Sequence, residues 1–90
     1  MSALITYAMI ASLALLPERY DYPPTAPYTV TAVSKELLRE VCRQPARNLL
    51  GCTVLATNEV FIRDDMTGDA FKRVLRHELG HVNGWRHYGD

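Results

Sequence analysis

The stretch TGDAFKRVLRHELGHVNGW, residues 67–85, decides the fold because it has the pattern of one long amphipathic helix. Its apolar residues recur at helical spacing, which predicts a side that packs on a core; they are Phe71, Val74, Leu75, Leu79 and Val82. We expect Thr67 or Asp69 to cap its N-terminus, and we expect the helix to end near Asn83, just before Gly84.

The residues before this helix predict three strands and one further helix. Residues 28–33 alternate β-branched and small side chains, as strands do, and Ser34 is placed to cap a helix that runs to about Cys42. Residues 52–56 and 60–63 are two strand-like runs that flank a hairpin turn around Asn58. The order β-α-β-β-α predicts an α+β domain over residues 28–90, with a small antiparallel sheet.

Two segments precede this domain. Residues 17–27 are rich in proline and tyrosine and are expected to be extended, because proline fixes φ and lacks an N–H donor. Residues 1–16 carry no charged side chain, and they are too short for a stable membrane span, which needs roughly 20 apolar residues. They fit either an export signal or a retained N-terminal helix or strand.

Composition narrows the classes of partner. Ten basic and ten acidic side chains cancel to a formal net charge of zero, so no basic surface for nucleic acid is indicated. A hydrophobic content of 48% indicates a folded globule, and 90 residues make one small domain. The oligomeric state does not follow from these values.

The oxidation state expected for the two cysteines, Cys42 and Cys52, depends on where the protein is located. In an exported or periplasmic protein, a pair this close predicts a disulfide, whereas in a cytoplasmic or virion-associated protein it predicts two small buried side chains. The disulfide is therefore expected if residues 1–16 are an export signal, and two free cysteines are expected if these residues are retained.

All three histidines of the chain lie at its C-terminal end, in HELGHVNGWRH, residues 77–87. On a helix, residues four apart differ by about 40° in direction and about 6 Å in height, so His77 and His81 can bind one metal ion. Gly84 can end the helix and let the chain bring His87 to the same ion. Three histidines and one open position suit a catalytic zinc site, in which Glu78 can take a proton from zinc-bound water.

This stretch resembles the metzincin consensus His-Glu-x-x-His-x-x-Gly-x-x-His, and the whole chain looks like small phage- or prophage-encoded metallopeptidases of bacteria. The resemblance implies a minimal zincin-like fold, Zn²⁺ on His77, His81 and His87, and general base and acid work by Glu78. Metzincins also have a methionine-containing turn after the third histidine, and only residues 88–90 follow it here.

Further roles are predicted around this motif. Tyr88 can donate to a developing oxyanion. In zinc peptidases of this kind an edge strand before the active helix pairs with the extended substrate, and residues 60–63 are the candidate. We expect Trp85 to pack against the first helix.

Two functions fit these features. One is a zinc-dependent metallopeptidase that hydrolyses a peptide or protein substrate. The other is a phage or prophage interaction protein, without enzymatic activity, in which the same residues hold a structural zinc ion, since small domains gain stability from such metals.

Overall fold

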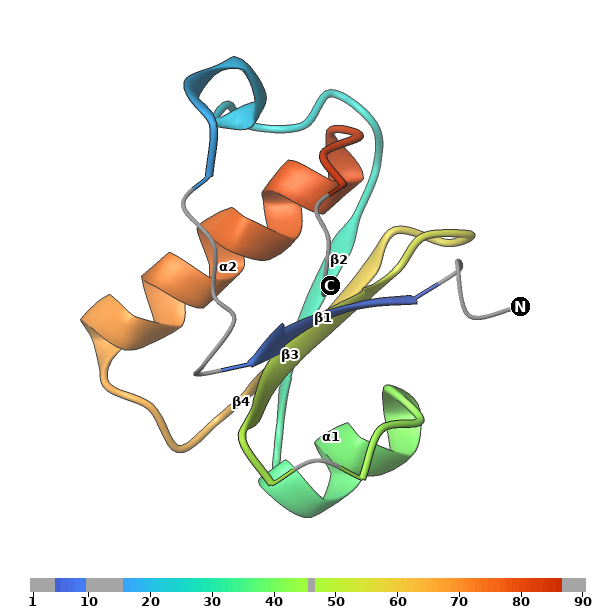
Figure 1. Ribbon diagram of the computed structural model, residues 1–90, viewed down its shortest axis with the longest axis vertical. Coiled ribbons are helices and arrows are strands. Elements are labelled where there is room, and N and C mark those ends of the chain that lie inside the picture. The colour runs from blue at the N-terminus through green and yellow to red at the C-terminus, as the bar shows by residue number, and fades with distance from the viewer. Residues whose placement is uncertain (1–4, 10–15, 46, 87–90) are drawn as a thin grey trace.

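The computed structural model describes residues 5–9, 16–45 and 47–86, which form a four-stranded sheet between two helices (Figure 1). The strands are β1 (Ile5–Met9), β2 (Thr29–Val33), β3 (Leu49–Val54) and β4 (Glu59–Arg63). The helices are α1 (Lys35–Val41) and α2 (Gly68–Val82), and Glu18–Tyr20 form a short 3-10 helix. From β2 onward the order is β-α-β-β-α, so the prediction of this α+β order is confirmed.

The sheet is mixed, with the strand order β1-β3-β4-β2. Strand β3 runs antiparallel to both β1 and β4, but β2 runs parallel to β4, so the predicted antiparallel sheet is wrong for that pair. Between β2 and β4 the chain passes through α1 and then through β3, which runs in the opposite direction. It therefore enters β4 in the same direction as β2. The prediction that residues 60–63 form an edge strand is also wrong, because β4 is hydrogen-bonded on both sides.

The N-terminal segment contributes a strand. Residues Ile5–Met9 pair with β3, so of the helix and the strand expected for a retained segment these five residues form the strand. Removal of residues 1–16 as an export signal stays a prediction. Among the helices that the structure describes, none has the length and apolar character needed to cross a membrane.

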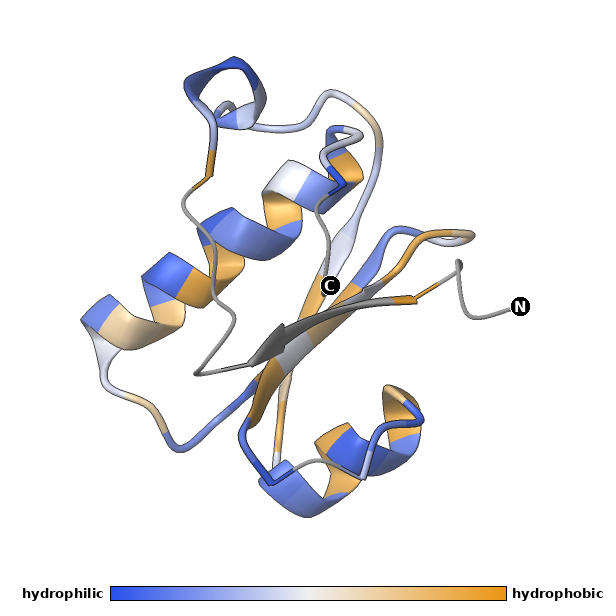
Figure 2. Cartoon of the chain, viewed as in Figure 1, coloured by the Kyte–Doolittle hydropathy of each residue, from blue (hydrophilic) through white to orange (hydrophobic). Residues whose placement is uncertain are grey.

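Each face of the sheet carries its own hydrophobic cluster, because side chains alternate between the two faces of a strand. The cluster under α2 is built on Leu50, Val60, Ile62 and Val74, and all five apolar residues predicted to line the α2 stripe belong to it. The cluster under α1 is built on Val33, Leu38, Cys42, Leu49 and Cys52. Both helices alternate between hydrophobic and hydrophilic residues along their ribbons, as amphipathic helices do (Figure 2). Burying a side chain such as Ile62 completely contributes roughly 1.5–3 kcal/mol.

Gly51 lets α2 approach β3 closely. A Cβ atom at this position would lie 2.8 Å from the carbonyl oxygen of Phe61 and 3.2 Å from Cγ1 of Val74. Because backbone atoms cannot move aside cheaply, a side chain here would force β3 and β4 apart at Phe61, and the Val74 side chain of α2 would have to shift by a few tenths of an ångström. Gly51 therefore permits the close pairing of β3 with β4 and the close approach of Val74 to β3.

The helix ends follow the expected capping chemistry. The Ser34 hydroxyl accepts a hydrogen bond from the Leu37 amide, and the Thr67 hydroxyl accepts one from the Ala70 amide. Thr67, and not Asp69, is therefore the cap of α2. The helix ends at Val82, and Gly84 follows it with a φ of +102°, as predicted for the end of this helix.

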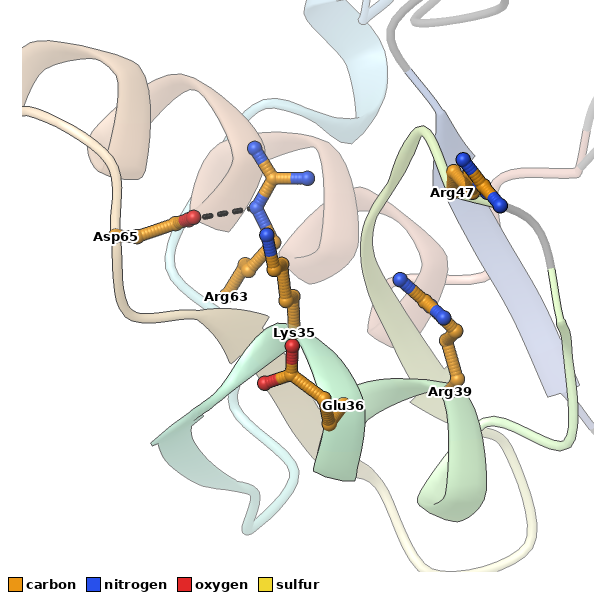
Figure 3. A pocket seen from close by; sticks show the side chains of 6 residues that line it. All are labelled: Lys35, Glu36, Arg39, Arg47, Arg63 and Asp65. Atoms are coloured by element: carbon orange, nitrogen blue, oxygen red, sulfur yellow. Dashed lines mark hydrogen bonds and ion pairs between the residues drawn. The ribbon is translucent and has the colours of Figure 1, made fainter.

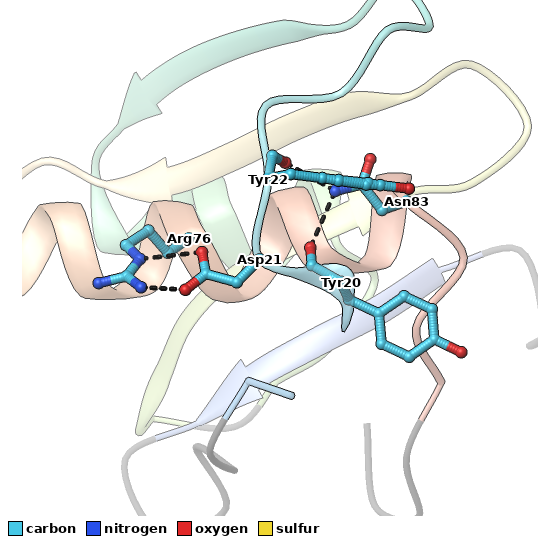
Figure 4. A network of polar contacts seen from close by, with 5 residues as sticks. All are labelled: Tyr20, Asp21, Tyr22, Arg76 and Asn83. Atoms are coloured by element: carbon cyan, nitrogen blue, oxygen red, sulfur yellow. Dashed lines mark hydrogen bonds and ion pairs between the residues drawn. The ribbon is translucent and has the colours of Figure 1, made fainter. Parts of the chain in front are cut away.

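The proline- and tyrosine-rich segment lies along the outer side of α2 (Figure 4). The Asn83 side-chain amide donates to the carbonyl oxygens of Tyr20 and Tyr22, at 2.9 and 2.8 Å. Arg76 forms an ion pair with Asp21. The hydrogen bond to this carboxylate, and then its negative charge, raise the pKa of the Arg76 guanidinium. These contacts hold the segment on the helix that carries the histidines.

Cys42 and Cys52 form a disulfide that joins the end of α1 to β3, with their Cα atoms 6.0 Å apart. Both side chains are completely buried in the cluster under α1. The disulfide therefore fixes α1 to the face of the sheet opposite α2.

We predict that replacing both cysteines by serine lowers the free energy of unfolding by about 2–3 kcal/mol, because the cross-link restricts the unfolded chain. Urea denaturation of the oxidised wild type and of the double variant measures this difference. Wild type treated with a reductant is the matched control and should behave like the variant. An unchanged midpoint after reduction would show that the disulfide contributes nothing to stability.

Candidate metal centre

Helix α2 brings His77 and His81 to one point on its sheet-facing side. Their Nε2 atoms lie 3.1 Å apart, and the two side chains are 2% and 1% exposed. Two nitrogens that bind one tetrahedral zinc ion at 2.0–2.1 Å are about 3.3 Å apart. The observed spacing therefore fits a shared metal ion with little rearrangement.

The other nitrogen of His81 is held by the backbone beyond the helix. Nδ1 of His81 lies 2.7 Å from the carbonyl oxygen of Trp85. As only a protonated Nδ1 can donate to a carbonyl, this bond leaves the Nε2 lone pair available to a metal, the usual arrangement for a histidine ligand. The reversal at Gly84 presents this carbonyl, because the Trp85 amide turns back to donate to the Gly80 carbonyl at 2.9 Å.

The indole of Trp85 packs on both histidines. Its ring stacks on His81 with centroids 5.0 Å apart and meets His77 edge-on at 4.9 Å. The expectation that Trp85 packs against the first helix is therefore wrong, since its ring lies against the imidazoles and is only 5% exposed. A large aromatic ring there restricts the imidazole orientations and excludes water from one side of the pair.

Glu78 points to β3 and is held there by Thr53. The Thr53 hydroxyl lies 2.6 Å from Oε1 of Glu78 and 3.3 Å from the Glu78 carbonyl oxygen, and both residues are completely buried. Thr53 was not predicted as a site residue, and its one signal in the sequence is a hydroxyl within the apolar run LLGCTV. A buried carboxylate needs such a donor, since burial removes its hydrogen bonds to water.

Two of the three predicted metal ligands, His77 and His81, therefore meet, while Glu78 is directed to Thr53 on β3. His87 and Tyr88 lie outside the described residues. In residues 5–9, 16–45 and 47–86, no group of three or more His, Cys, Asp or Glu side chains is placed to hold a metal ion. A complete centre would have to take at least one ligand from beyond Arg86 or from solvent.

A second polar region lies beside α1 and contains no histidine. It is a hollow of about 380 Å³ lined by Lys35, Glu36, Arg39, Arg47, Arg63 and Asp65 (Figure 3). Arg63 donates from Nε to Asp65 at 2.6 Å. Four cationic side chains and only two carboxylates line this hollow, which disfavours the binding of a metal cation there. The histidine pair on α2 therefore remains the candidate centre.

Comparison with family models, with curated proteins and with solved structures finds no match to this chain. Any proposal about function therefore depends on the geometry of α2 and β3, together with the motif in residues 77–87.

We predict that Thr53 positions the Glu78 carboxylate. Thr53→Val has nearly the same volume but lacks the hydroxyl, so it should lower the free energy of unfolding by about 1–3 kcal/mol, the cost of a buried acceptor without its donor. Thr53→Ser is the matched variant that keeps the hydroxyl. Chemical denaturation should find it closer to wild type than Thr53→Val, and an equal loss in both would mean that only packing matters at this position.

Proposed function

We propose that this chain is a zinc-dependent metallopeptidase, with His77, His81 and His87 as the metal ligands and Glu78 as the general base. The observation that carries the proposal is the 3.1 Å separation of the two Nε2 atoms on α2. The Nδ1 bond of His81 to the Trp85 carbonyl supports it, because it leaves Nε2 as the nitrogen that binds the metal.

When bound, the zinc ion would polarise the scissile carbonyl and make a water molecule unusually acidic. Glu78 would take a proton from the attacking water and return it to the leaving amine. Thr53 holds Oε1 of this carboxylate and so fixes its orientation on β3. Trp85 keeps water away from one side of the imidazole pair, where electrostatic interactions become stronger.

A structural zinc ion is the second candidate, and the burial of the site favours it. His77, Glu78 and His81 are each no more than 2% exposed, and an open catalytic site has to admit water and substrate. In this alternative the metal would hold the C-terminal end of α2 to the following chain, in a protein that binds a partner without hydrolysis.

We predict that Glu78→Gln separates the two functions. The amide matches the carboxylate in size but has no basic oxygen at neutral pH, so the variant should keep zinc and its melting temperature. It should lose hydrolysis by a factor of roughly 10² or more, the usual scale for removal of a general base. Cleavage of a peptide library and zinc content by mass spectrometry measure the two properties.

His77→Ala is the paired variant, and it should lose both the metal and the activity. Lys72→Ala, on the exposed side of α2, should lose neither. If the wild type binds zinc but cleaves nothing in the library, and a hydroxamate inhibitor does not stabilise it, the structural alternative replaces the enzyme.

A further inference from the structure

The candidate centre is closed, which conflicts with the access that hydrolysis requires. His77, Glu78, His81 and Thr53 are each 2% exposed or less. If the proposed function holds, some part of the chain has to move before a peptide can reach these residues. The elements that contact the site show which part this is.

Strand β1 covers the edge of the sheet beside Glu78. It pairs antiparallel with β3, in a register that sets Thr6 opposite Thr53, the residue that holds Glu78. The opposite edge of β3 is occupied by β4, which belongs to the cluster under α2. Strand β1 also contacts α2 itself, so it lies between solvent and the elements that carry the site.

Leu16 makes a second contact with the site helix. A Cβ atom at Gly80 would clash with Cδ1 of Leu16 and would lie 3.0 Å from Cε3 of Trp85. Gly80 lies between the two histidines in sequence, and Trp85 stacks on His81. The missing side chain at Gly80 therefore lets Leu16 pack directly on the helix surface beside the histidine pair.

We propose that β1 and Leu16 are autoinhibitory: β1 fills a peptide-binding edge of β3, and Leu16 covers α2 at Gly80. The edge of β3 supplies main-chain hydrogen bonds, which accept any extended segment, and the present occupant, ITYAM, carries no charge. The ligand class for this edge is therefore an extended, uncharged peptide in antiparallel orientation. Displacing β1 should open the site to solvent. Only the expected increase in hydrolysis rests on the proposed function.

Proline substitutions in the full-length chain test whether β1 detaches on its own. Backbone N–H groups alternate in direction along a strand, so only one of Thr6→Pro and Tyr7→Pro removes a hydrogen bond to β3, and the other is its matched control. In the disruptive variant, those amides of residues 49–54 that donate to β1 should exchange with deuterium at least about tenfold faster, as expected for the loss of roughly one ladder bond, while those that donate to β4 should not. Amides of residues 59–63 should keep their wild-type rates.

The reactivity of the histidines provides a readout without catalysis. Diethyl pyrocarbonate should modify His77 and His81 at least about tenfold faster in the metal-free disruptive variant than in the metal-free wild type. Mass spectrometry of the digested protein locates the modified histidines. Leu16→Ala, which leaves the β1–β3 pairing in place, should accelerate this modification as well. A synthetic peptide with the sequence of residues 4–10 should restore protection to the disruptive proline variant.

The outcomes separate this inference from the proposed function. Faster modification and faster hydrolysis in the disruptive variant support both. Faster modification without any hydrolysis supports autoinhibition of access and contradicts the peptidase. If neither proline variant changes exchange in residues 49–54, or if residues 59–63 lose protection with them, β1 belongs to the cooperative core and the inference is overturned.

Discussion

The close packing of α2 on β3 is the constraint on which the candidate centre depends. Two residues of β3 that face α2 set it: Gly51 lets Val74 approach the strand, and Thr53 bonds to Glu78. The first determines how near the helix lies, and the second fixes which side it presents. With the helix held in this way, its periodicity alone brings His77 and His81 together.

This arrangement places two imidazoles and a carboxylate in the interior of a small domain. Burial of polar groups costs free energy unless hydrogen bonds replace those to water. Here Thr53 donates to Glu78 and the Trp85 carbonyl accepts from His81. On the other face of the sheet, the disulfide fixes α1 to β3, so that the sheet beneath the site is held from both sides. A metal bound by the imidazoles would add binding free energy to folding.

Much of this domain could be predicted from local patterns. The caps at Ser34 and Thr67, the apolar stripe of α2 and the end of α2 before Gly84 each depend on residues close in sequence. The parallel pairing of β2 with β4 and the strand at residues 5–9 depend on partners far along the chain, which no local pattern specifies. For the same reason, the motif indicated the histidine pair, but it did not indicate that Thr53 would bond to Glu78 or that the Trp85 ring would pack on the histidines.

We propose that His77 and His81 share one metal ion in a centre completed by a third imidazole. The zinc X-ray absorption spectrum of the full-length, zinc-loaded protein tests it most directly. It should show three nitrogen ligands at about 2.0–2.1 Å with the scattering pattern of imidazole, and one further light-atom ligand. A sulfur shell at about 2.3 Å, or fewer than two imidazoles, would contradict the claim.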